Sequence, residues 1–244
     1  MPADLARPRL QTLQTILLVA PVLLFSVIAH EIAHGYAALK QGDRTALEAG
    51  RLSWNPAKHI DLYFTILLPL IMLTGSLLAG GRGIVLGGAK PVPVDPRNYR
   101  NIRRGDIIVS LAGVATNFVI AIACALLIVL TGLLGRVVPA LEGTLGILQA
   151  MFALGVQINA VLIAFNLLPI PPLDGSHVMK YLLPRPLAIR YVQFGRYGIL
   201  VLVLLLFLGE KLLVAWLHPA LVFVDWTVQL VGPYALPTAK QWLQ

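Results

Sequence analysis

Charged residues are scarce in this chain of 244 residues. They make up 12% of the sequence, whereas soluble proteins carry about 25%, and hydrophobic residues make up 58%. This composition excludes nucleic-acid-binding modules and soluble Rossmann or barrel enzymes. Cysteine is nearly absent as well: Cys124 stands alone, so no intrachain disulfide can form and a secreted disulfide scaffold is excluded. The 19 Lys and Arg outnumber the 11 Asp and Glu, which in so apolar a chain indicates loops on the cytoplasmic side of a membrane.

Long apolar runs dominate what is present. A membrane-spanning helix needs roughly 20 apolar residues, and runs of about that length occupy residues 13–39, 62–78, 107–134, 145–168, 189–208 and 212–231. We therefore predict an all-α polytopic membrane protein with about five to six transmembrane helices. It would form a single integral membrane domain over residues 1–244, with a core at about 13–180 and additional C-terminal helices at about 189–231.

The first run contains a metal-binding pattern, His30-Glu31-Ile32-Ala33-His34. Two histidines four residues apart in a helix lie on one face, which suits two ligands of a tetrahedral zinc. A glutamate beside them is placed to act as general base on the water that such a site activates. The alternative is that neighbouring helices merely satisfy these polar groups. It is less favoured because three ionisable residues within five positions of a membrane helix are costly without a use. Since the run continues into this motif, we do not expect it to be cleaved as a signal peptide.

A catalytic zinc usually has a third protein ligand, and the sequence offers two candidates. Asp174 follows a stretch with three prolines in four positions, Pro169-Ile170-Pro171-Pro172, which must end the preceding helix. Broken backbone at membrane depth lines a wet cavity or is buried in protein, so a carboxylate there indicates a site residue. His177 is the competitor, and we favour Asp174 over it. The polar residues Asn117, Asn159 and Asn166 either line a water-filled cavity or form hydrogen bonds that serve only packing.

These motifs resemble the site-2 protease family of intramembrane zinc metalloproteases. The resemblance rests on the histidine motif in an apolar helix, on Asn166-x-x-Pro169-x-Pro171-x-x-Asp174-Gly175, and on Leu111-Ala112-Gly113-Val114-Ala115-Thr116-Asn117. The family usually has proline where this chain has Val114. The resemblance implies one catalytic Zn²⁺, a compact member without PDZ or CBS domain, and roles for the following residues: zinc ligands His30, His34 and Asp174, general base Glu31, and substrate or oxyanion contacts Asn117 and Asn166.

Coordination by one zinc also constrains the topology. Since His34 lies near the end of one helix and Asp174 just past another, both helices must run the same way and an even number of crossings must separate those ends. The run at 62–78, which is interrupted by Pro69 and Gly75, is therefore expected to be re-entrant. Most Lys and Arg residues then lie on one face, which places the active site toward the cytoplasm. Residues 87–94 look extended and could form a short β-hairpin edge that pairs with an unwound substrate, or an ordinary interfacial loop.

The function predicted from these observations is regulated intramembrane proteolysis by a zinc metalloendopeptidase. Its partners would be the lipid bilayer and a membrane protein whose transmembrane segment is cleaved, and no nucleic acid would be bound. It would be a multi-pass integral protein of a bacterial cell membrane. A metal-ion transporter is one alternative, but the sequence shows no continuing path of ionisable residues apart from Asp225. A catalytically inactive membrane chaperone is the other, and the presence of base and ligands disfavours it.

Overall fold

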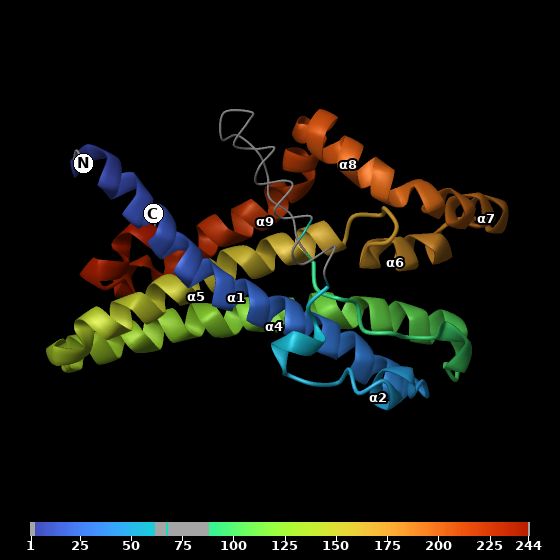
Figure 1. The fold of residues 1–244 in the computed structure, drawn as a ribbon, viewed down its shortest axis with the longest axis horizontal. Coiled ribbons are helices and arrows are strands. Elements are labelled where there is room, and N and C mark those ends of the chain that lie inside the picture. Colours follow the sequence, from blue (N-terminus) through green and yellow to red (C-terminus); the bar gives the residue numbers. More distant parts are fainter. Residues whose placement is uncertain (1–2, 62–66, 68–87, 244) are drawn as a thin grey trace. The chain divides into compact units, whose positions relative to one another are not determined.

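The computed structural model describes residues 3–61, 67 and 88–243, and the elements within this part of the chain are helices. The α-helices are α1 (Ala3–Gln41), α2 (Thr45–Glu48), α4 (Ile102–Val137), α5 (Glu142–Asn166), α6 (Asp174–Leu182), α7 (Arg185–Phe194), α8 (Gly198–Leu208) and α9 (Glu210–Val231) (Figure 1). Short 3-10 helices connect or extend them: η1 (Pro56–Lys58), η3 (Pro96–Asn98), η4 (Pro139–Leu141), η5 (Gly195–Tyr197), η6 (Gly232–Tyr234) and η7 (Pro237–Trp242).

Helices that could cross a bilayer account for most of the described chain. Five stretches are long and apolar enough, at residues 14–41, 102–137, 139–166, 185–208 and 210–234. They confirm the predicted all-α polytopic membrane fold. The apolar run at 62–78 falls almost wholly outside the described residues, so its re-entrant path stays a prediction. Residues 88–94 contain no strand, and residue 87 lies outside the described part, so the short β-hairpin is not confirmed.

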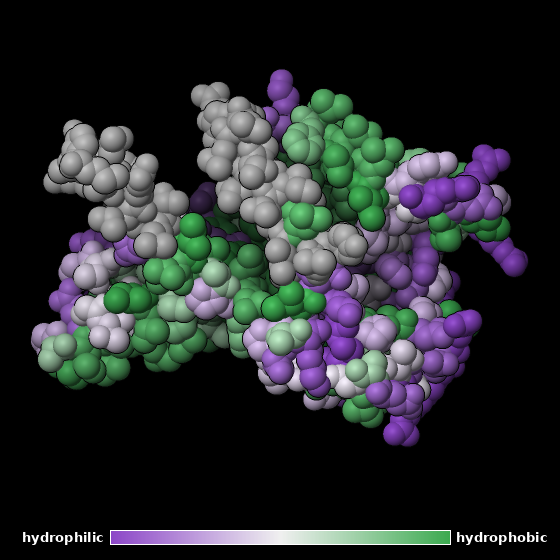
Figure 2. All heavy atoms as spheres, in the orientation of Figure 1, coloured by the Kyte–Doolittle hydropathy of each residue, from purple (hydrophilic) through white to green (hydrophobic). Residues whose placement is uncertain are grey.

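The surface of α8 shows what surrounds these helices. Ile199, Leu200, Phe207 and Leu208 are all exposed, the last at 81% of its surface, and Figure 2 shows this helix covered by hydrophobic residues. A soluble protein does not expose apolar patches of this kind to water without a partner, whereas such patches are stable in contact with the hydrocarbon chains of lipids. The exposed apolar surface therefore faces lipid.

The described chain packs into two compact units. The first contains α1 up to Ser26, residues 117–163, and residues 218–244. Its core includes Ile128 of α4, Val156 of α5 and Val224 of α9. Gln149 is fully buried there and donates hydrogen bonds from Nε2 to the carbonyl oxygens of Ile128 (2.8 Å) and Tyr234 (3.1 Å). Buried polar groups of this kind join helices where lipid offers no hydrogen bonds.

The second unit contains residues 27–116 and 164–217, and it carries the predicted site residues of α1 and α6. A buried carboxylate, Asp43, organises the loop after α1. It accepts hydrogen bonds from the Thr45 hydroxyl (2.5 Å), the Asp95 amide (2.7 Å) and the Asn98 side chain (2.9 Å). The Arg100 amide donates to the carbonyl of Gln41 (2.8 Å), so the end of α1 and the approach to α4 lie side by side.

Candidate metal centre

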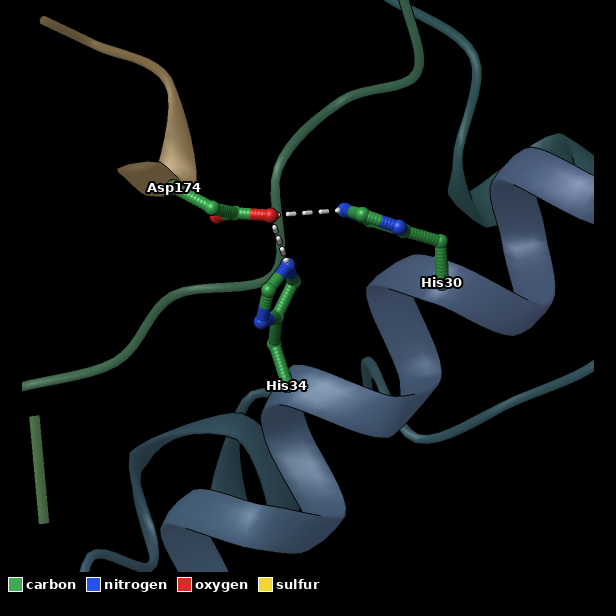
Figure 3. A group of neighbouring side chains, drawn as sticks. All are labelled: His30, His34 and Asp174. Atoms are coloured by element: carbon green, nitrogen blue, oxygen red, sulfur yellow. Dashed lines mark ion pairs between the residues drawn. The ribbon is translucent and has the colours of Figure 1, made fainter. Parts of the chain in front are cut away.

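The two histidines of α1 lie one turn apart and face a single point. Their ring centroids are 4.6 Å apart and the ring planes are nearly perpendicular, at 83°. Both Nε2 atoms approach Oδ2 of Asp174, at 3.1 Å from His30 and 3.4 Å from His34 (Figure 3). The helical spacing predicted from the sequence thus produces a convergent pair.

Asp174 reaches the histidines because the proline-rich turn ends α5 and a new helix begins with this residue. Leu173 is extended, with φ −70° and ψ 155°, and α6 starts immediately after it. The turn is held by α7, whose Tyr191 hydroxyl donates to the carbonyl of Pro169 (2.9 Å). Gly175 leaves room for a close approach, since a Cβ there would lie 2.2 Å from the carbonyl oxygen of Leu167. The second unit therefore fixes the carboxylate at the start of α6.

The donor set fits a zinc ion. The ligand atoms of His30, His34 and Asp174 all lie within 4.8 Å of one another. Asp174 Oδ2 is buried yet accepts no hydrogen bond of normal geometry from the described residues, so it suits a cation placed between it and the two rings. Nδ1 of His34 lies 2.7 Å from the carbonyl oxygen of Val109. A carbonyl only accepts, so Nδ1 donates, and in the neutral ring the Nε2 lone pair would be available to a metal ion.

Glu31 follows His30 on α1, and a backbone group holds its carboxylate. Oε2 accepts a hydrogen bond of 2.8 Å from the amide of Val92, which is 61 residues away in sequence. Sequence reasoning identified Glu31 but not Val92, because nothing in the local pattern relates the two.

The other residues singled out from the sequence have different surroundings. Asn117 is completely buried in α4, and Asn166 is the partly buried last residue of α5. Their contact with substrate or oxyanion stays a prediction. Asn159 is buried and donates to the Ser26 hydroxyl (2.9 Å), a hydrogen bond between α5 and α1 within the first unit. His177 turns to another partner: its Nδ1 lies 3.1 Å from Asp106 Oδ1, so the geometry favours Asp174 over it as third ligand.

Asp106 was not anticipated. It lies in the first turns of α4, only 2% exposed, and binds three groups of α6. These are His177, Lys180 at 2.5 Å and the Tyr181 hydroxyl at 3.0 Å. Burial, together with the negative charge of Asp106, raises the pKa of Tyr181 to about 12. A carboxylate at the start of an apolar run was the available signal, since such a group is costly unless paired. Asp106 thus ties α6, which begins with Asp174, to α4.

Comparison with known proteins decides the family. Residues 18–207 match the sequence pattern of peptidase family M50. The chain belongs to this family. It is 38% identical over 183 residues to a Bacillus subtilis protein named "Putative zinc metalloprotease YwhC", an alignment that covers 75% of this chain and 77% of that protein. It is 32% identical over 208 residues to "Putative zinc metalloprotease Rip2" of Mycolicibacterium smegmatis, covering 84% and 71% of the two chains.

A third relative is the Rip2 protein of Mycobacterium tuberculosis, 31% identical over 189 residues that cover 78% of this chain and 66% of that protein. No solved structure matches the chain. Family and fold together make this M50 peptidase a multi-pass membrane zinc metalloprotease, as the resemblance to site-2 proteases implied.

Proposed function

We propose that this M50 peptidase cleaves peptide bonds within transmembrane segments of other membrane proteins. In this proposal His30, His34 and Asp174 hold the zinc and Glu31 is the general base. The observation that carries it is the convergence of the three ligand atoms on α1 and α6, with Glu31 on the same helix.

The chain's own groups have distinct tasks in this reaction. When bound, zinc would polarise the scissile carbonyl and make the attacking water acidic enough to lose a proton near neutral pH. Glu31 takes that proton on its carboxylate and delivers it to the leaving amine nitrogen. The Val109 carbonyl fixes the tautomer of His34, and the proline-rich turn fixes the carboxylate of Asp174. Both supports keep the ligands in place while the peptide bond changes geometry.

Depth in the membrane supports a substrate inside the bilayer. Measured from Lys40 near the end of α1, His34 and His30 lie roughly 9 and 15 Å deeper at 1.5 Å per residue. The hydrocarbon core is about 30 Å thick, so the site would lie well inside it. A peptide bond at this depth belongs to a transmembrane segment.

The connections between the helices support the proposed topology. Lys90 donates its amide hydrogen to the carbonyl of His59 (2.7 Å), and Arg100 donates to Gln41 (2.8 Å). Residues on either side of the 62–78 segment are therefore neighbours, which supports a re-entrant segment. The many basic residues between α1 and α4 support a cytoplasmic position for this end of the helices.

Single cysteines in a Cys124→Ser background test this topology. Arg44 follows α1 and Glu142 is the first residue of α5, so Arg44→Cys and Glu142→Cys place one thiol before α4 and one after it in the chain. An impermeant thiol reagent should reach the first only from the cytoplasm and the second only from outside. Labelling of both from one side would contradict the proposed topology.

The catalytic assignment is tested by exchanging one atom of the base. Glu31→Gln should keep zinc, because the ligands are untouched, while cleavage falls by about 10² to 10⁴-fold. Elemental analysis of the purified protein and cleavage of a model membrane peptide measure the two effects. Asp174→Ala should lose zinc and activity together, whereas the matched His177→Ala should keep zinc. Wild-type turnover by Glu31→Gln, or zinc loss in His177→Ala alone, would refute the assignment.

The nature of the substrate is tested by its helicity. A continuous helix hides its carbonyls in hydrogen bonds, so the substrate must unwind near the cut. Replacing Gly or Pro near that position with Leu removes about 1 or 3 kcal/mol of helix destabilisation, and each 1.4 kcal/mol should slow cleavage about tenfold. Rates that do not depend on substrate helicity would show that the enzyme takes extended segments from outside the bilayer.

The alternatives receive no support from the structure. A metal transporter needs successive ligand sets along a path, and within the described residues one group of three His, Cys, Asp or Glu side chains converges. An inactive chaperone would not need a general base next to a set of zinc ligands.

A further inference from the structure

The carboxylate of Glu31 accepts a hydrogen bond from the backbone N–H of Val92, and the residues on either side of Val92 have no N–H that could replace it. Val92 lies between Pro91 and Pro93, and proline has no amide hydrogen. Val92 is therefore the one backbone donor in this tripeptide, and it points that donor at Oε2 of Glu31 from 2.8 Å. Among the described residues, the other carboxylate oxygen of Glu31 has no hydrogen-bond partner.

The segment that carries Val92, residues 88–95, is fixed on both sides and is called the strap below. Before Val92, the Lys90 amide donates to the His59 carbonyl (2.7 Å). Arg51 Nη2 donates to the carbonyl of Lys90 (2.8 Å) and lies 3.4 Å from that of Pro91. After Val92, the Asp95 amide donates to the buried Asp43 (2.7 Å). The strap is thus anchored to the loop that follows α1.

Packing fixes Val92 itself. Its side chain is 6% exposed and lies over Gly35, where a Cβ would come within 3.0 Å of Val92 Cγ1. Gly35 is adjacent to His34 on α1, so the strap packs against the helix turn that carries the histidine motif. Pro91 and Pro93 restrict the backbone on each side. The amide of Val92 is therefore presented to Glu31 by a rigid element.

We propose that the Val92 N–H is a positioning group for the general base. It holds one oxygen of Glu31 and leaves the other free to take the proton of the attacking water. A glutamate side chain otherwise rotates freely about three bonds, and fixing it in advance removes that cost from the reaction. The proposal rests on the proposed role of Glu31 as base.

The same contacts bear on the expected edge at residues 87–94. The amide and carbonyl of Lys90 and the amide of Val92 are all engaged by groups of this chain. At these positions the strap is not an open edge for a substrate strand. Its role at the site is to orient Glu31.

The direct test replaces one amide by an ester. Substituting Val92 with its α-hydroxy acid removes the N–H and keeps the side chain. We expect kcat for a model membrane peptide to fall on the order of tenfold, the size of one lost hydrogen bond to a charged group, with KM and zinc content unchanged. The matched control is the same ester at Val94, whose amide makes no hydrogen bond with the described residues, and it should keep the wild-type kcat.

Each result other than this one overturns the proposal. An unchanged or raised kcat would show that the N–H does not assist the base, a change in KM alone would place it on the substrate, and lost zinc would make it structural. In a Glu31→Gln background the ester should cause no further loss, because the group that it orients is gone. If Glu31→Gln itself kept full turnover, the proposed function would fail, whereas a slow Glu31→Gln with an unaffected Val92 ester would refute the positioning role alone.

An ordinary substitution gives an independent measurement. Arg51→Ala removes the side chain that pins the carbonyls before Val92, and it should lower kcat several-fold without changing KM or zinc content. Arg44→Ala is the control, because the Arg44 side chain is exposed and, among the described residues, pairs with Glu48 at 3.7 Å and makes no hydrogen bond to the strap. Equal kcat in the two variants would show that the strap does not need this anchor and would contradict the proposal.

Discussion

Gly113→Ala is expected to weaken zinc binding although it adds only one methyl group. Gly113 lies on α4 against the imidazole of His30. A Cβ there would be 2.5 Å from Cε1 and 2.6 Å from Nε2 of His30, whereas ordinary contacts begin at 3.4 Å. The ring or the helix must therefore move by about 1 Å, and zinc ligands tolerate deviations of only about 0.2 Å.

Movement of α4 instead of the ring would not relieve the site. The carbonyl of Val109, one turn before Gly113, holds Nδ1 of His34 at 2.7 Å. A shift of α4 that spares His30 therefore displaces the support of His34. We expect zinc affinity to fall by about 10 to 100-fold, the loss typical when a group supporting a ligand is disturbed, which is about 1.4 to 2.7 kcal/mol of binding.

The assay combines zinc competition with a fluorescent chelator and thermal unfolding with and without metal. Alanine is about 1 kcal/mol better than glycine inside a helix, so helix propensity alone predicts stabilisation of the metal-free protein. The control is Gly143→Ala, because nothing lies within 4 Å of a Cβ at that position, and zinc affinity there should not change. Wild-type zinc affinity in Gly113→Ala would refute the placement of His30 against α4.

Two further predictions concern buried carboxylates. Asp106→Asn should lower the free energy of unfolding by about 2 to 3 kcal/mol, because it removes the charge that binds Lys180 and His177. It should also weaken zinc binding, because Asp106 holds α6, which begins with Asp174. Equal zinc affinity in the variant and the wild type would show that α6 keeps its place without Asp106. Burial raises the pKa of Asp43, but hydrogen bonds from Thr45, Asn98 and the Asp95 amide outweigh burial and lower it. A lowered pKa in the folded state stabilises the protein above about pH 4, and this stabilisation is lost as the pH falls further. Asp43→Asn should therefore make the free energy of unfolding, measured by denaturant unfolding, depend less on pH in the acid range. An unchanged pH dependence in that range would contradict this.

The helices and the candidate ligands on α1 follow from local patterns of residues. Apolar length specifies membrane helices because lipid leaves the backbone no other partner. Helical period alone puts His30 and His34 on one face, and prolines alone require a break before Asp174. The convergence of all three atoms within 4.8 Å follows the predicted pattern. The roles of Asn117 and Asn166 stay predictions.

The groups that support these ligands come from distant parts of the chain and are visible only in the folded structure. His177 is three residues from Asp174, yet it faces Asp106, which is 71 residues away. Glu31 accepts a hydrogen bond from the amide of Val92, and His34 donates one to the carbonyl of Val109. Every residue has a backbone carbonyl and nearly every residue an amide, so these partners cannot be recognised from residue type. Local periodicity specifies which face of a helix a side chain occupies, whereas contacts between distant segments depend on how the helices pack, and that packing is set by the whole chain.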